Sequence, residues 1–393
     1  MKWLKNILDK IKPHFDKGGY LEKYYPVFEA TDTILFSTDK RTHSGPHIRD
    51  SLDVKRVMIL VVIALLPAYI FGAMNIGYQM ALSLGQTNTW SENLIQGALK
   101  ILPIIAVTFG AGALWEIIFS VVRKHPISEG FLVTCALIPL IMPPTIPLWQ
   151  VAVATSFGIV IGKEIFGGVG MNIFNPALVA RAFLFFTYPV RISGDKVWIS
   201  GPDGYSGATA LAIPAAEKSQ DAVTLLDSVS QFDYSWLNMF MGWVPGSIGE
   251  TSTLWIMVGA IFLLVTGMAS WRVMVGAIIG LTGMATLTNF MAELTGSSNT
   301  MLTLPAHYHL VMGGFAFGVV FMATEPVTGT HTDKGRWVYG IFIGGLTVII
   351  RSINPAYPEG TMLAILLMNA FAPLIDYFVI QGNIKQRMAR YAK

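Results

Sequence analysis

The sequence is poor in charge and almost free of cysteine. Only 13% of its 393 residues are charged and 53% are hydrophobic, whereas a soluble domain carries about 25% charge. This balance excludes a soluble enzyme, a disordered protein and a nucleic-acid binder. The single cysteine, Cys135, excludes an internal disulfide, a cysteine-ligated iron–sulfur cluster and a cysteine-rich zinc site. Residues 1–53 also lack the short apolar core of a signal peptide.

Apolar runs close to the length of a membrane-spanning helix recur along the chain. They predict an all-α integral membrane protein with ten transmembrane helices. The third and fifth segments are short, and Pro, Gly or Asn at their ends indicates broken helices. The ten segments span residues 55–74, 99–121, 128–142, 148–166, 173–188, 253–269, 273–292, 308–324, 337–352 and 361–380.

The lysines and arginines predict the orientation, because loops rich in them stay in the cytoplasm. With ten spans and both termini in the cytoplasm, 21 of the 27 basic residues lie inside. Nine spans would place the basic C-terminal tail outside. We therefore expect a multi-pass protein of a bacterial inner membrane, with residues 189–252 as one long outside loop.

The two halves of the chain share the tripeptide Asn-Pro-Ala, at 175–177 and at 354–356. Five spans per half is an odd number, so the halves have opposite orientations, as in transporters built from inverted repeats. Chance similarity between apolar sequences is the alternative. The predicted domains are a cytoplasmic extension (1–54), a first five-helix repeat (55–188), a periplasmic loop (189–252), a second five-helix repeat (253–380) and a cytoplasmic tail (381–393).

The N-terminal extension begins with Leu4, Ile7, Leu8 and Ile11 at helical spacing, with lysines between them. This pattern predicts an amphipathic helix on the membrane surface. A solvated basic tail is the alternative. Residues 19–48 are rich in aromatic and turn-forming residues, and we expect them to pack on the membrane domain.

Within the outside loop stands Asp203-Gly204-Tyr205-Ser206-Gly207-Ala208-Thr209. From the residues alone this is a turn of small residues that exposes a hydroxyl and permits close approach of another molecule. From composition alone, an ordinary Asp-Gly turn is the better explanation. However, the stretch resembles the D-x-x-S-G-A-T motif of flavoproteins in which FMN is joined to Thr through its phosphate. The joining enzyme, a flavin transferase, works outside the cytoplasmic membrane.

The whole chain resembles the B subunit of the Na⁺-translocating NADH:quinone reductases, and also the D subunit of the Rnf ferredoxin:NAD⁺ reductases. The resemblance rests on the motif and on the strings 143–150, 167–168 and 172–186. The 54-residue extension favours the quinone reductase, because the Rnf protein usually starts near its first span.

The resemblance implies a membrane redox subunit without a catalytic acid or base. Electrons pass from the FMN-bearing C subunit to FMN on this chain, then to non-covalent riboflavin and to quinone, while Na⁺ moves outward. By matching position, Thr209 carries the covalent FMN. The attachment motif then comprises Asp203, Ser206, Gly207 and Ala208.

The resemblance also places Asn172 and Asn175 beside riboflavin. An Asn amide offers both a donor and an acceptor, which suits the polar edge of a flavin. Alternatively, Asn175-Pro176 only caps a broken helix. The family places the quinone near the cytoplasmic face, where Gly112 and Glu116 lie in the second segment.

Four acidic residues lie in or at the ends of the apolar segments, where ionisable groups usually face a protein interior or a water path. Of these, we expect Glu116, Glu325 and Asp376 to take part in the Na⁺ path, because carboxylates are hard ligands. Glu164 is simpler to explain as the ion-pair partner of Lys163. Snorkelling at the interface is the alternative for each acid.

Arg181, inside the fifth segment, requires an anion or several carbonyl oxygens. It contacts a bound flavin or the FMN phosphate, or it pairs with an acid such as Asp376; the sequence leaves both open. His307 and His309 do not make a metal site by spacing alone, and we predict none.

Two other classes of protein compete with the redox subunit. Ten spans with inverted halves also describe a solute channel, and a scaffold protein would need no cofactor. Thr209 and its motif favour the redox subunit, because neither alternative uses them. No nicotinamide-binding G-x-G-x-x-G unit occurs, so activity requires partner subunits.

Overall fold

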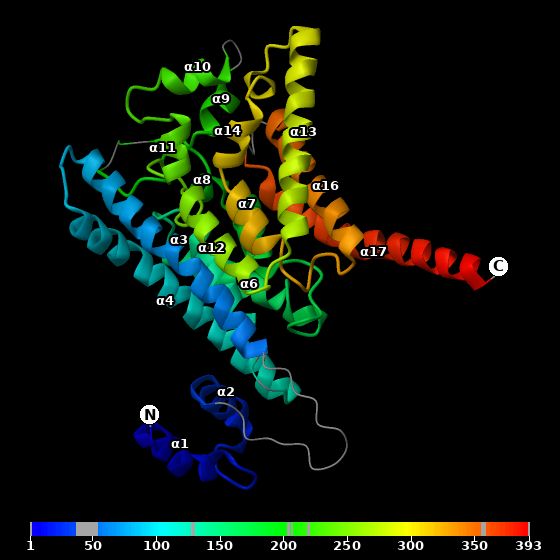
Figure 1. Cartoon of the computed structure of the whole chain (residues 1–393). Coiled ribbons are helices and arrows are strands. Elements are labelled where there is room, and N and C mark those ends of the chain that lie inside the picture. The colour runs from blue at the N-terminus through cyan, green and yellow to red at the C-terminus, as the bar shows by residue number, and fades with distance from the viewer. Residues whose placement is uncertain are drawn as a thin grey trace.

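The structure is a computed structural model that describes residues 2–36, 54–125, 127, 130–202, 205, 207–217, 221–354 and 359–391. Across these ranges the regular structure is helical, without a strand, which agrees with the predicted all-α class. α3 to α17 form one body, from which the end of α17 projects, and α1 and α2 lie below it (Figure 1).

The described part of the N-terminal extension is a pair of helices. α1 (Lys2–Phe15) packs on α2 (Tyr25–Leu35), with the rings of Phe15 and Phe28 stacked at 5.2 Å, and the short η1 (Glu22–Tyr24) precedes α2. α2 contacts α4. Trp3, Ile7 and Ile11 of α1 are exposed, and such an apolar stripe among lysines fits a helix on a membrane surface.

The first half has two long helices and three short ones. α3 (Val54–Ser83) and α4 (Trp90–Arg123) run side by side (Figure 1). α4 begins with a capping box, in which Thr89 and Glu92 each bond the other's backbone N–H. The short elements are α5 (Gly130–Leu140), α6 (Leu148–Val160), η2 (Glu164–Phe166) and α7 (Pro176–Thr187).

The segment between the halves builds a second core together with residues 301–312 of the second half. Its helices are α8 (Pro189–Ile192), α9 (Ala212–Ala216), α10 (Ala222–Asp227) and α11 (Trp236–Met241). Trp198, Leu211, Phe232 and Tyr234 belong to a buried apolar cluster that is separate from the cluster inside the helical body. The segment therefore packs as a small cap, which positions Thr209.

The second half has a different order, with one short helix, one long helix, a broken series and two long helices. It contains α12 (Thr253–Val265), α13 (Trp271–Thr295), η3 (Thr300–Leu302), α14 (Ala306–Val311), α15 (Phe315–Phe317), the π-helical turn η4 (Gly318–Met322), α16 (Asp333–Ile353) and α17 (Thr361–Tyr391).

Glycines bring α13 and α16 into backbone contact. A Cβ on Gly344 would lie 2.0 Å from the carbonyl oxygen of Ala277, and one on Gly280 would lie 2.0 Å from that of Ile341. Small residues at such crossings are typical of helices that pack in a membrane, because the backbones can approach closely.

Six of the described helices are long and apolar enough to cross a membrane. Three shorter apolar helices, Gly130–Leu140, Pro176–Thr187 and Thr253–Val265, fall in other predicted segments. Helical residues also occur in the predicted segment 308–324, but as the broken series α14, α15 and η4. The chain is thus a multi-pass helical membrane protein, and the count of ten crossings stays a prediction.

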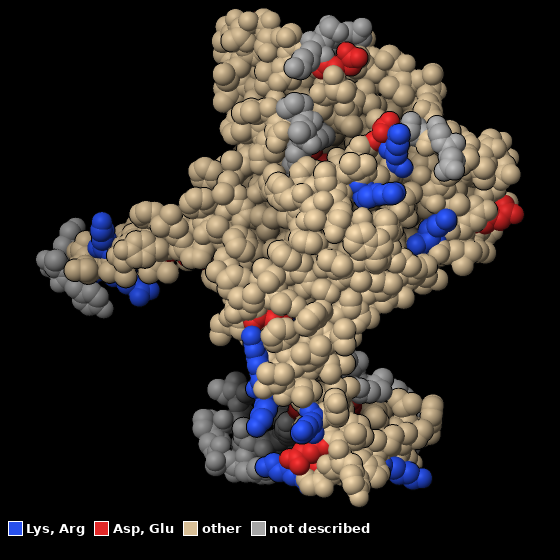
Figure 2. All heavy atoms as spheres, turned by 180° about the vertical axis from the view of Figure 1, so that it is seen from behind, with Lys and Arg blue, Asp and Glu red and all other residues tan. Residues whose placement is uncertain are grey.

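The charged surface agrees with a membrane location. On the face seen in Figure 2, Lys and Arg side chains lie around the end with α1 and α2, at the tip of α17 and on the upper part of the body, and most of the remaining surface is uncharged. The first two places belong to segments that the sequence predicts to be cytoplasmic.

Candidate functional site

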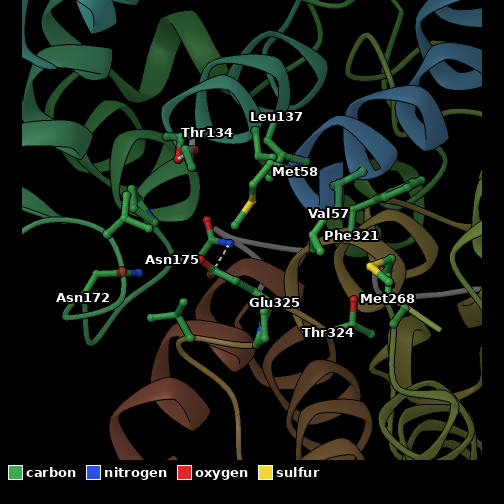
Figure 3. A pocket seen from close by; sticks show the side chains of 18 of the residues that line it. Val57, Met58, Thr134, Leu137, Asn172, Asn175, Met268, Phe321, Thr324 and Glu325 are labelled. Atoms are coloured by element: carbon green, nitrogen blue, oxygen red, sulfur yellow. Dashed lines mark hydrogen bonds between the residues drawn. The ribbon is translucent and has the colours of Figure 1, made fainter. Parts of the chain in front are cut away.

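A cavity of about 820 Å³ opens among α3, α5, α12 and the start of α7 (Figure 3). Apolar side chains such as Met58, Leu137 and Phe321 form most of its wall. The polar groups that line it include Asn172, Asn175, Glu325, Lys163, Thr134 and Thr324. Three residues that the sequence singles out, Asn172, Asn175 and Glu325, are therefore brought to one cavity.

Asn175 uses its side chain in two ways. Its Oδ1 accepts from the backbone N–H groups of Ala177 (3.0 Å) and Leu178 (3.2 Å), which caps α7. Its Nδ2 donates to Oε2 of Glu325 at 2.9 Å, the bond drawn in Figure 3. The capping interpretation of Asn175 is thus confirmed, and the same amide also joins the two halves of the chain.

Asn172 and Glu325 are held by local bonds. Nδ2 of Asn172 donates to the carbonyl of Phe174 at 3.2 Å. Glu325 also accepts from the hydroxyl of Thr328 at 2.9 Å. Asn172 and Glu325 approach the cavity from opposite halves, which gives it amide and carboxyl groups set in an apolar wall.

A network of buried charges lies behind this cavity. Nζ of Lys163 is 2.5 Å from Oε2 of Glu116 and 3.3 Å from Oε1 of Glu164, and these three residues are at most 2% exposed. Arg123 completes the network at 3.2 Å from Glu164. The predicted Lys163–Glu164 pair is confirmed. The Glu116 carboxylate is neutralised by the same lysine, which itself lines the cavity.

Gly112 lies one turn before Glu116 on the buried face of α4. A Cβ at this position would meet Sγ of Cys135 at 2.5 Å and the ring of Phe131 at 2.9 Å. The glycine therefore permits close packing of α4 on α5. Neither Gly112 nor Glu116 is among the described residues that line the large cavity.

Asp376 lies apart from these groups, on α17. Its carboxylate accepts from the backbone N–H of His331 (2.7 Å), the backbone N–H of Thr332 (3.1 Å) and the hydroxyl of Thr332 (2.5 Å). Asp376 thereby fixes the turn that starts α16.

Thr209 lies in the cap, directly after a tightly packed turn. The hydroxyl of Tyr234 donates to the carbonyl of Ala208 at 2.6 Å, and burial raises the pKa of this phenol, so it remains a donor. A Cβ on Gly207 would come within 2.5 Å of Ile199. Asp203, Gly204 and Ser206 of the predicted motif lie outside the described residues.

Arg181 makes a buried junction between distant parts of the chain. It donates to Glu250 at 3.0 Å, to Ser247 at 3.4 Å and to Glu359. The expectation that Arg181 pairs with an acid is confirmed, but Asp376 as that acid is wrong, because it is engaged at the start of α16.

Two smaller cavities connect Thr209 to this junction. One of about 440 Å³ is lined by Thr209, Glu250, Thr251 and Glu359, among others. The other, of about 370 Å³, is lined by Thr209, Arg181 and Glu359. Burial raises the pKa of the Glu250 carboxyl to about 7, although the Arg181 guanidinium acts in the opposite direction.

Sequence reasoning missed Glu250, Glu359 and Arg351. Arg351 is fully buried and donates to the carbonyls of His309 (2.8 Å), Met312 (2.8 Å) and Glu359 (3.0 Å). The only signal in the sequence is that each of the three adjoins a Gly- or Pro-rich break between apolar segments. Across the described ranges, no group of three or more His, Cys, Asp or Glu side chains is placed to hold a metal ion.

Comparison with known proteins gives a consistent result. The family described as NQR2, RnfD, RnfE matches residues 41–385. The chain is 49% identical to a protein of Yersinia pestis that is named as the B subunit of a Na(+)-translocating NADH-quinone reductase, over 98% of this chain and 99% of that protein. It is 49% identical to a protein of the same name from Chromohalobacter salexigens, over 99% and 97%.

Proposed function

Because the chain belongs to the NQR2, RnfD, RnfE family, we propose that it is the B subunit of a Na⁺-translocating NADH:quinone reductase and that it carries FMN on Thr209. The names of its full-length relatives favour this complex over the D subunit of an Rnf reductase. The bound flavins supply one- and two-electron transfer from the FMN of a partner, the C subunit, towards quinone, coupled to outward Na⁺ transport.

The observation that carries the proposal is the setting of Thr209. The carbonyl of the preceding residue, Ala208, accepts a 2.6 Å bond from Tyr234, which fixes the backbone there. Thr209 itself borders two cavities. A hydroxyl held in this way at a cavity edge fits a group that a flavin transferase must reach and that then remains in one orientation. Gly207 lets Ile199 and the ring of Phe232 pack closely against the turn that precedes Thr209.

The cavity with Asn172, Asn175 and Glu325 fits riboflavin. Its largely apolar wall suits a flat aromatic ring system. The amide of Asn172 and the hydroxyls of Thr134 and Thr324 supply neutral polar contacts, and riboflavin has no phosphate that would need a cation. Asn175 positions Glu325 at the same wall.

The Na⁺ path on the cytoplasmic side then uses Glu116, Glu325 and Asp376. Each lies within or beside an apolar segment and each is already hydrogen-bonded or ion-paired in the structure. A passing Na⁺ must therefore displace the hydrogen-bond or ion-pair partners of each of these three carboxylates. The quinone lies near Gly112 and Glu116, on the far side of Lys163.

We also propose that the two halves are inverted repeats in a bacterial inner membrane, with both termini cytoplasmic. Similar contacts within the two halves support the repeat. In the first half the second helix contacts the third and fourth, as α4 with α5 and α6; in the second half α13 contacts α14 and α16. The fourth contacts the fifth in both, as α6 with α7 and α16 with α17. Pro355 and Ala356, part of the repeated tripeptide, lie outside the described residues.

The test of flavin attachment is mass spectrometry of the tryptic peptide Val197–Lys218. The protein is made in a host that expresses its flavin transferase. We expect a mass gain equal to FMN less one water, localised to Thr209, absent in Thr209→Ala and retained in the control Ser200→Ala. An unmodified peptide would contradict the proposal and leave a channel as the better interpretation.

The test of the ion path replaces Asp376 with Ala or Asn in the assembled complex. We follow the rate of flavin reduction at a series of Na⁺ concentrations. Both variants should need a higher Na⁺ concentration than the wild type to reach the same rate, because each substitution removes the negative charge. A Na⁺ dependence unchanged from the wild type would remove Asp376 from the path.

A further inference from the structure

The cavity of about 440 Å³ beside Thr209 is lined by oxygen atoms from three different segments. Glu250 and Thr251 precede α12, Glu359 precedes α17, and Thr209 belongs to the cap. These residues are far apart in sequence, so the cavity exists only in the folded chain.

With both glutamates ionised, the charges around this cavity balance before any modification. Arg181 contacts Oε2 of Glu250 at 3.0 Å and Oε2 of Glu359. Arg351 is fully buried and bonds the backbone carbonyl of Glu359 at 3.0 Å. Arg181 thus holds both carboxylates, and Arg351 adds a second positive charge beside them. A phosphate ester on Thr209 would add one negative charge to this balanced set, in a place largely shielded from water.

A buried hydroxyl in the cavity wall has no partner. Oγ1 of Thr251 makes no hydrogen bond although the residue is only 7% exposed. A buried polar atom of this kind is costly unless a ligand or water bonds it. On the same cavity, the Glu250 carboxylate packs against the backbone of Gly314, where a Cβ would lie 2.5 Å from Oε1.

We propose that the cavity bordered by Thr209, Glu250, Thr251 and Glu359 is a binding site for Na⁺, completed by the phosphate that joins FMN to Thr209. Carboxylate, hydroxyl and phosphate oxygens are hard ligands of the kind that such a cation prefers. The bound cation offsets the charge that the ester adds. The inference rests on the proposed function, because it takes the modified Thr209 as one wall of the site.

This site gives the attached FMN a second role. Besides carrying electrons, its phosphate becomes a fixed ligand near the outer end of the Na⁺ path. Thr251 and Glu359 are then ligands of the cation. Arg181 keeps the two carboxylates in place without occupying the whole cavity.

The experiment measures equilibrium binding of ²²Na⁺ to the purified, assembled complex. Thr209→Val is compared with the wild type in a host with the flavin transferase, so that the partner keeps its own FMN. We expect the wild type to bind one Na⁺ more per complex than Thr209→Val. Thr251→Val and Glu359→Gln should weaken this site at least about tenfold. The control Thr282→Val, on the exposed face of α13, should bind as the wild type does.

Two results would overturn the inference, and they can be told apart. If peptide mass spectrometry finds FMN on Thr209 while Thr251→Val and Glu359→Gln bind Na⁺ like the wild type, the site is wrong and the proposed function stands. If Thr209 carries no FMN, both fall together. Should Glu359→Gln fail to assemble, Thr251→Val decides alone, because Val keeps the size of Thr and removes only the hydroxyl.

Discussion

Lys163, three residues after the end of α6, lies 2.5 Å from Glu116 on α4, and both side chains are almost wholly buried. The pair joins α4 to a turn 47 residues further along the chain. Its lysine lines the large cavity, while its glutamate does not.

Replacing Lys163 with Met should destabilise the protein by about 3–5 kcal/mol, because it leaves buried carboxylates without their cation. Thermal unfolding of the detergent-purified complex measures this. The double variant Lys163→Met with Glu116→Gln should recover much of the loss. Lys100→Met, at an exposed position of α4, serves as the control. If the double variant is no more stable than the single one, loss of the Lys163–Glu116 pair is not the cause of the destabilisation.

Asn175→Ser separates the two tasks of this side chain. Ser still caps α7, so the helix should keep its stability to within about 1 kcal/mol. It cannot reach Glu325 as the amide does, so the carboxylate loses a bond of 2.9 Å. We expect less riboflavin to co-purify with Asn175→Ser than with the wild type, although both unfold at similar temperatures.

The matched variant is Asn175→Ala, which loses the cap and the bond together. It should unfold at a lower temperature than Asn175→Ser. Equal riboflavin content in all three proteins would show that Asn175 only caps the helix.

Tyr234→Phe should slow the attachment of FMN to Thr209. The substitution leaves the carbonyl of Ala208 buried without its 2.6 Å bond, at a cost of about 1–3 kcal/mol, and loosens the turn before Thr209. The fraction of modified peptide at early times of expression measures the effect. Tyr377→Phe, on the exposed surface of α17, should be modified at the normal rate.

Gly344→Ala tests the contact between α13 and α16. The added methyl would lie 2.0 Å from a backbone oxygen, which cannot rotate away. We expect a loss of about 1–3 kcal/mol in stability. Gly283→Ala, on α13 with nothing within 4 Å of the new methyl, should be neutral or slightly stabilising. Equal unfolding temperatures for the two variants would contradict the close contact.

The sequence predicted correctly several features that are determined by neighbouring residues. The apolar segments, the cap at Asn175 and the Lys163–Glu164 pair all depend on residues close in sequence, and each appears in the structure. The helical N-terminus of the extension follows from its spacing of apolar residues in the same way.

The partners of Arg181 could not be read from the sequence. Glu250 lies 69 residues and Glu359 178 residues away, and no periodicity relates them to α7. Both acids stand in breaks between apolar segments, where a charge is usually solvated. Only the packing of the cap and of the start of α17 onto α7 removes them from water and makes the arginine their partner.

The glycines between α13 and α16 have a mechanical consequence. Where backbone touches backbone, no rotamer change can let one helix slide by a fraction of a turn, so the two helices behave as one rigid block. Any alternation between inward and outward access then requires rotation of that block as a unit. The necessary bending falls on the non-helical joints at its ends, at Gly296 after α13 and in the turn before α16 that Asp376 holds.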